Sequence, residues 1–164
     1  MLGVALLYVG AVLFVNGVSL LGKIDAKAAA VMNIFTGGLT LILNIVVLAK
    51  ATDITVFYAG ATGLLFSFTY LYVAATNIFG LDGRGLGWYC LFVAITAVPS
   101  SYLSFIANDF RFGIIWLAWA FLWFLFFLLT ALQKPILKFT AWVTILVGIV
   151  TCWIPGYLIL INKW

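Results

Sequence analysis

The sequence contains no histidine and no glutamate, and its only acidic residues are four aspartates. Asp25, Asp53, Asp82 and Asp109 each fall in a stretch predicted to connect two apolar segments. No acid or base is left within an apolar segment, where proton-coupled transporters, voltage sensors and intramembrane metalloenzymes need one. Hydrolytic triads and zinc sites lack a base or a ligand. We therefore expect no enzyme activity, no metal and no cofactor.

Cysteine and charge are also scarce. Cys90 and Cys152 lie within apolar segments and do not have metal-ligand spacing, so both are expected to be small packing residues. The net charge of +4 comes from lysines and arginines that flank the apolar segments, as is usual beside membrane spans. The sequence has no basic patch of the kind that would indicate a nucleic-acid partner.

Hydrophobic residues make up 67% of the chain, and the mean hydropathy is +1.30, far above that of a soluble domain. The chain divides into six apolar segments of roughly 18 to 25 residues, each long enough to cross ~30 Å of hydrocarbon. Helices are expected because the alternating polarity of barrel strands is absent. The predicted spans are residues 1–21, 28–49, 54–78, 87–106, 112–132 and 139–161.

The connections are short, so the six spans are expected to form three antiparallel hairpins within a single all-α membrane domain, residues 1–164. The first span lacks the basic region and cleavage site of a signal peptide. Basic residues are more numerous on one side of the predicted membrane, which favours both termini outside. That side carries Lys23, Lys27, Arg84, Lys134 and Lys138, and the opposite side carries Lys50, Arg111 and Lys163.

The first span has two adjacent stripes. One stripe lies within an arc of about 80° at helical spacing and consists of Leu2, Leu6, Val9, Leu13 and Asn16. The second consists of Gly3, Gly10 and Gly17, which would let a neighbouring helix approach closely. Both stripes could serve packing alone, or the leucine stripe could face a lumen.

The fifth span has an aromatic face within an arc of about 100°, formed by Phe112, Trp116, Trp119, Trp123, Phe126 and Phe127. Trp119 and Trp123 lie deep in this span, whereas tryptophans of the lipid interface lie near span ends. A deep indole N–H needs a partner helix or a polar cavity. With Phe68 and Tyr72 of the third span, these residues describe a narrow aromatic tube for a small, flat, neutral solute. Interhelical packing is the alternative.

Six ordered blocks run along the chain: MLGVALLYVG, AVMNIFTGGL, ATGLLF with TYLY, GWYCLFVAI, IIWLAW, and KFTAW with WIP. Together they resemble the AmiS/UreI family of urea and short-chain amide channels. The resemblance implies a six-helix protomer with its own pore, assembled as a homo-hexameric ring in the bacterial plasma membrane. It also implies a permeant that is urea or a small amide, and a functional link to a cytoplasmic urease or amidase.

The resemblance places the pore on specific residues. The family's pore positions correspond to Leu2, Leu6, Val9, Leu13, Asn16, Phe68, Tyr72, Trp119, Leu122 and Trp123. Helical spacing and aromatic content independently indicate all of these residues except Leu122.

A family member that opens in acid has long, histidine-rich outer loops, whereas the outer connections here cover only about residues 51–53 and 107–111. Since the chain has no histidine, we expect no opening through histidine protonation. Two other classes stay open: a non-conducting membrane scaffold or accessory subunit, and a channel for acetamide-type amides, ammonia or water. Ammonia channels usually need pore histidines, and water channels need two Asn-Pro-Ala turns, and neither is present here.

Overall fold

The computed structural model describes residues 1–164 and contains six rods that are long and apolar enough to cross a membrane. The first four rods are α1 (Leu2–Leu20), α2 (Ala26–Ala49), α3 (Ile54–Phe79) and α4 (Gly83–Ile106). The fifth is α5 (Phe110–Phe126) followed by the π-helical segment η1 (Phe127–Ala131). The sixth is α6 (Leu137–Val147), the π-helical segment η2 (Gly148–Trp153) and α7 (Ile154–Leu160). The six predicted spans are confirmed.

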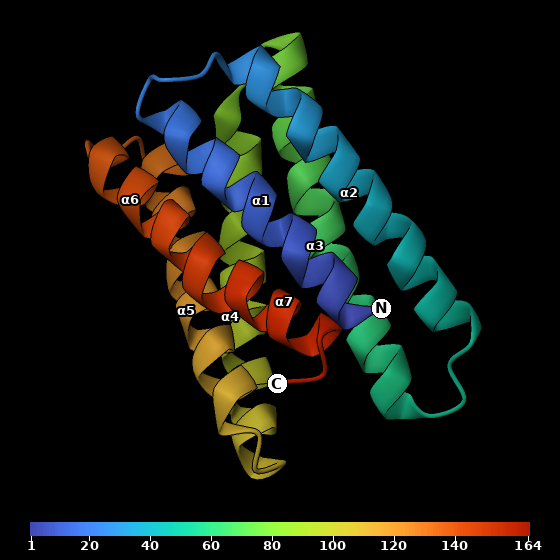
Figure 1. Ribbon diagram of the computed structural model, residues 1–164. Helices are drawn as coiled ribbons and strands as arrows, with labels where there is room; N and C mark the ends of the chain where they lie inside the picture. Colours follow the sequence, from blue (N-terminus) through green and yellow to red (C-terminus); the bar gives the residue numbers. More distant parts are fainter.

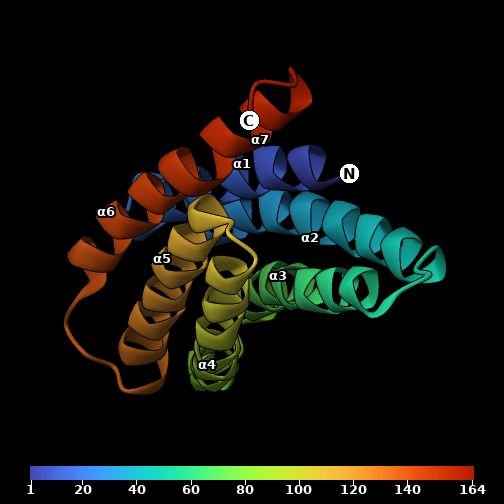
Figure 2. The ribbon, with the colours of Figure 1, turned by 90° about the horizontal axis from the view of Figure 1, so that it is seen from below.

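The rods stand side by side, and the two chain ends lie close together (Figure 1). Seen from below, consecutive rods follow one another around the molecule, and the sixth rod returns to α1 (Figure 2). Contacts are most extensive between α2 and α3 and between α4 and α5. The rods therefore form a closed ring of six.

Every aspartate in the chain is the N-cap of a helix. The side-chain acceptors and backbone N–H donors are Asp25 with Lys27 and Ala28, Asp53 with Thr55 and Val56, Asp82 with Arg84, and Asp109 with Phe112. Each cap satisfies backbone donors that the first helical turn leaves free, and such a cap stabilises a helix by about 1 kcal/mol. The caps fix where α2 to α5 begin, and they keep all four carboxylates at helix ends.

The rods are more polar on their buried faces than on their exposed faces. In α2, Asn33, Thr36 and Thr40 are fully or almost fully buried. The exposed large side chains of the same helix are Val31, Ile34, Phe35, Ile42 and Ile45. An outer surface of this kind suits hydrocarbon, while the interior supplies the hydrogen bonds that lipid cannot offer.

Side-chain hydrogen bonds join neighbouring rods at five of the six contacts around the ring. They are Asn16 with Asn33, Asn44 with Ser67, Tyr58 with Ser100, Ser101 with the carbonyl of Gly113, and Trp119 with Thr151. Bonds of this kind contribute on average about 0.6 kcal/mol each within a membrane protein. They set the rotation of each rod about its axis, because a turned rod would lose its partner.

The sixth contact, between α1 and the sixth rod, relies on glycine. A Cβ atom placed on Gly10 would lie 2.7 Å from the backbone nitrogen of Trp153, and one on Gly17 would lie 2.8 Å from the carbonyl oxygen of Ala141. Gly3 faces α7 in the same way. The predicted role of the glycine stripe in close helix packing is confirmed.

Candidate pore

Two cavities lie inside the ring. One lies at the end of the ring where α1 connects to α2, α3 to α4 and α5 to α6, and we call it the hairpin-side cavity. It has a volume of about 480 Å³ and lies among the C-terminal parts of α1, α3 and α5 and the start of α4. The terminus-side cavity has a volume of about 420 Å³ and lies among the N-terminal parts of α1, α3 and α5 and the end of α2. Phe66 and Trp119 line both cavities. The two cavities therefore adjoin at these two rings, on a path along the axis of the protomer.

An aromatic cluster occupies this junction. The Phe66 ring centroid lies 4.8 Å from that of Trp119 and 4.7 Å from that of Trp123, with the rings edge to face. Both tryptophans are buried. Edge-to-face pairs contribute about 0.5–1.5 kcal/mol beyond the area that they bury, so the cluster is a rigid element. We call Phe66, Trp119 and Trp123 the aromatic constriction.

The Trp119 indole is held from the sixth rod. Its Nε1 donates a hydrogen bond of 2.9 Å to the hydroxyl oxygen of Thr151, and that hydroxyl donates in turn to the carbonyl oxygen of Val147 at 2.7 Å. The sequence left two possible partners for a deep indole N–H, a neighbouring helix or a polar cavity. The structure shows that the Trp119 N–H is already bound, so Trp119 presents its ring to the cavities and not its donor.

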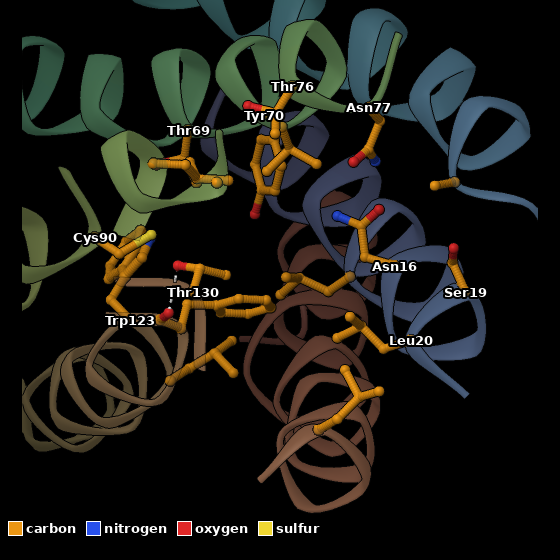
Figure 3. A pocket seen from close by; sticks show the side chains of 18 of the residues that line it. Asn16, Ser19, Leu20, Thr69, Tyr70, Thr76, Asn77, Cys90, Trp123 and Thr130 are labelled. Carbon is orange, nitrogen blue, oxygen red and sulfur yellow. Dashed lines mark hydrogen bonds between the residues drawn. The ribbon is translucent and has the colours of Figure 1, made fainter. Parts of the chain in front are cut away.

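Polar side chains face the hairpin-side cavity from α1 and α3. Figure 3 shows the Asn16 amide and the Tyr70 hydroxyl both directed into this cavity. Two reciprocal hydrogen bonds, of 3.0 and 2.6 Å, join the amides of Asn16 and Asn33. Asn33 is fully buried and also donates to the carbonyl oxygen of Ala29. This pairing fixes the orientation in which the Asn16 amide meets the cavity.

The face that α3 turns toward the cavities differs from the one that the sequence indicated. Phe66 and Tyr70 line the hairpin-side cavity, whereas Phe68 is 47% exposed and lines neither cavity. Tyr72 also lines neither, and its ring lies 6.3 Å from that of Tyr89. Two residues of helix correspond to a rotation of about 200°, so Phe66 and Phe68 point in nearly opposite directions. The structure does not bring Phe68 and Tyr72 to the candidate pore.

The other sequence-predicted positions lie along the two cavities. The terminus-side cavity is lined by Leu2, Leu6, Val9 and Trp119, and the hairpin-side cavity by Leu13, Asn16, Trp119, Leu122 and Trp123. The leucine stripe of α1 thus borders both cavities in turn. Trp116 lines the terminus-side cavity, next to Trp119.

A row of threonines on α3, spaced at seven residues, also borders the cavities, although it was not predicted from the sequence. The members are Thr55, Thr62, Thr69 and Thr76, and all four line a cavity. The Thr69 hydroxyl donates to the carbonyl oxygen of Leu65 at 2.7 Å. Since a hydroxyl has only one proton, Thr69 can offer nothing but an acceptor to a solute.

The lining of the cavities is almost uncharged. The hairpin-side cavity has no charged side chain, and the terminus-side cavity has only Asp109, whose carboxylate caps α5. Nowhere do three or more cysteine or acidic side chains gather as metal ligands would. A path with aromatic walls, scattered hydrogen-bonding groups and little charge suits a neutral polar solute, because nothing in it replaces the hydration shell of an ion.

Comparison with known proteins places this arrangement in a family. The AmiS/UreI family transporter model matches residues 1–163. An acid-activated urea channel of Helicobacter pylori is 45% identical, with both chains covered completely, in an alignment of 194 positions. The putative transporter protein AmiS2 of Rhodococcus erythropolis is 49% identical over 98% of this chain and 80% of its own length. A cryo-EM structure of the Helicobacter pylori urea channel in a closed state superposes with a TM-score of 0.91 at 46% identity, covering all of both chains.

Proposed function

The chain belongs to the AmiS/UreI family of transporters, and from this premise we propose that it is a passive channel for urea and related short-chain amides. The observation that carries the proposal is the pair of cavities that adjoin at Phe66 and Trp119. Passive flow agrees with the absence of acidic and basic side chains at the constriction, because coupling to an ion gradient needs a group that binds the ion.

The chemistry of the lining suits a flat amide. The rings of Phe66, Trp119 and Trp123 form apolar walls against which a planar solute can slide. Hydrogen bonds to the edges of the solute are available from Asn16 and Tyr70 on the hairpin side. We propose that the path is lined by Leu2, Leu6, Val9, Leu13, Asn16, Phe66, Tyr70, Trp119, Leu122 and Trp123, with residues 1–164 acting as one domain.

Two phenylalanines on α3 provide a matched test of this path. Phe66→Ala removes a ring from the aromatic constriction, and we expect a change of at least about tenfold in urea permeability or in the ratio of acetamide to urea permeability. Phe68→Ala removes a phenyl ring from the outer face and should leave the urea permeability and the acetamide-to-urea ratio at their wild-type values. Stopped-flow light scattering with reconstituted proteoliposomes measures both.

The same experiment decides between a channel and a scaffold. A non-conducting scaffold or accessory subunit would leave the urea permeability of wild-type proteoliposomes at the value of protein-free liposomes. Equal effects of Phe66→Ala and Phe68→Ala would instead show that the path does not run through the aromatic constriction. Fluxes of water, ammonia, urea and acetamide through one preparation establish which solute is preferred.

We also propose the setting that the family resemblance implies: a homo-hexamer in the bacterial plasma membrane, with both termini outside and a urease or amidase in the cytoplasm. The large apolar side chains exposed on α2 and α4 agree with surfaces that meet lipid or other copies. Native mass spectrometry from detergent tests the hexamer, because a monomeric channel would appear at 18.0 kDa. The orientation is tested by adding a cysteine at either terminus of the protein and labelling it in intact cells with a thiol reagent that does not cross the membrane.

A further inference from the structure

We propose that Thr151, a residue that lines neither cavity, determines the size selectivity of the pore by holding the ring of Trp119 in place. The proposal rests on the proposed channel function and adds a positioning residue to it. Thr151 belongs to η2, the π-helical part of the sixth rod, and Trp119 belongs to α5. The two residues are joined by the buried hydrogen bond between the Trp119 Nε1 and the Thr151 hydroxyl.

The position of Thr151 depends on the π-helical segment. In a π-helix the backbone bonds span one residue more than in an α-helix, so the side chains beyond it are rotated relative to a continuous α-helix. Such segments occur often at functional sites. Pro155 is the second residue of α7, which follows η2 directly, and its missing N–H removes one bond that an α-helix would need at this point. The backbone here is therefore arranged so that Thr151 faces α5.

The Thr151 hydroxyl is oriented as an acceptor toward Trp119. It donates its only proton to the carbonyl oxygen of Val147 at 2.7 Å, and its remaining lone pairs can receive the indole N–H. Thr151 is itself 7% exposed, so water does not compete freely for either bond. A chain of two consecutive hydrogen bonds thus links the Trp119 ring to the backbone of the sixth rod.

Trp119 is the ring that this chain of bonds most affects. It lines both cavities and contacts Phe66 at 4.8 Å and Trp116 at 5.0 Å between ring centroids. A buried indole N–H without a partner is unfavourable, so loss of the Thr151 oxygen favours rotation of the ring toward polar groups in a cavity. Rotation moves the wall against which Phe66 packs, and the width of the junction changes with it.

The test compares a substitution that removes the hydroxyl at constant side-chain volume, Thr151→Val, with one that keeps the hydroxyl and loses a methyl group, Thr151→Ser. Thr144→Val is the matched control, because Thr144 is fully buried on the same rod and donates to its own i−4 carbonyl but has no indole partner. The quantity measured is the ratio of N-methylurea to urea permeability in proteoliposomes, with circular dichroism to verify that each variant is folded.

We expect Thr151→Val to change this ratio by about three- to tenfold, as the loss of one hydrogen bond of ordinary net strength allows, and Thr151→Ser and Thr144→Val to keep the wild-type ratio. Trp119→Phe removes the indole donor. In that background Thr151→Val should have no further effect, because Thr151 acts through the N–H that is gone.

Two results would overturn the proposal: a wild-type ratio in Thr151→Val, or an equal effect of Thr151→Val with and without the Trp119 indole. Neither result touches the channel function itself. That function is tested by the wild-type urea permeability, so the two proposals fail separately.

Discussion

Replacement of Gly10 by alanine should loosen the contact between α1 and the sixth rod. A Cβ atom at Gly10 would lie 2.7, 2.8 and 2.9 Å from the backbone nitrogen, Cβ and Cα of Trp153. Two of these atoms belong to the backbone and the third is fixed to it, so no side-chain rotation relieves the overlap. The closest atom would have to retreat by about 0.7 Å to reach ordinary van der Waals separation. Overpacking of this kind costs about 1–3 kcal/mol.

Gly38→Ala is the control for this substitution. Gly38 is also a helical glycine, but a Cβ atom there meets nothing within 4 Å. Alanine favours helix over glycine, so Gly38→Ala should be neutral or stabilise the protein by up to about 1 kcal/mol. The free energy of unfolding of both variants can be measured by titration with SDS in mixed micelles. If Gly10→Ala unfolds at the same SDS fraction as Gly38→Ala, the close approach of α1 to η2 is not a structural requirement.

Gly10→Ala has a second expected consequence, in the pore. Trp153 and Thr151 belong to the same η2 segment, so a shift of η2 away from α1 also moves Thr151 relative to Trp119. We therefore expect Gly10→Ala to change the ratio of N-methylurea to urea permeability in the same direction as Thr151→Val. A change in stability with a wild-type ratio would show that η2 does not move as a unit.

The remaining predictions concern pH and the asparagine pair. Urea permeability is expected to stay constant between pH 5 and 7.5, because the chain has no histidine, and stopped-flow traces that accelerate steeply toward pH 5 would contradict this. The side-chain hydrogen bond from Arg84 lowers the pKa of Asp82 below its ordinary value of 3.8, so the stability that this carboxylate contributes is complete above that value and is lost only as the pH falls further. Asn33→Ala is expected to lower the free energy of unfolding by about 1–2 kcal/mol, since the amide of Asn16 loses both reciprocal bonds; an unchanged SDS midpoint would show that the pair contributes nothing.

The spans were predictable because hydrocarbon thickness fixes the length of an apolar helix, and the four aspartates mark where helices begin. The leucine stripe of α1, which borders both cavities, was recognisable as a candidate lumen face because its helical spacing sets it beside a glycine stripe suited to close packing. The face of α3 that borders the cavities could not be predicted from the sequence. Aromatic residues occupy every second position in FSFTYLY and so lie on two opposite faces of the helix, and aromatic content alone could not choose between Phe66 and Phe68.

Two other features could not be read from residue patterns. The π-helical segments η1 and η2 alter the register of a helix without leaving a distinct sequence signal. The hydrogen bond between Trp119 and Thr151 could therefore not be predicted from the sequence. The division of the interior into two cavities depends on how three rings from two helices, α3 and α5, pack together. Periodicity within one helix carries no information about the distances between rings of different helices.

Every aspartate lies at a helix end, so the hairpin-side cavity has no acidic side chain and an acid-sensing residue can be introduced there. A glutamate introduced at Val73, on the wall of the hairpin-side cavity, would be the only acidic side chain there. A change of urea flux with pH that this variant shows and the wild type does not could then be attributed to that one group, because the hairpin-side cavity has no native acid or imidazole. A chain whose acids all serve as helix caps thus offers a route for building a pore whose flux depends on the protonation of one introduced side chain.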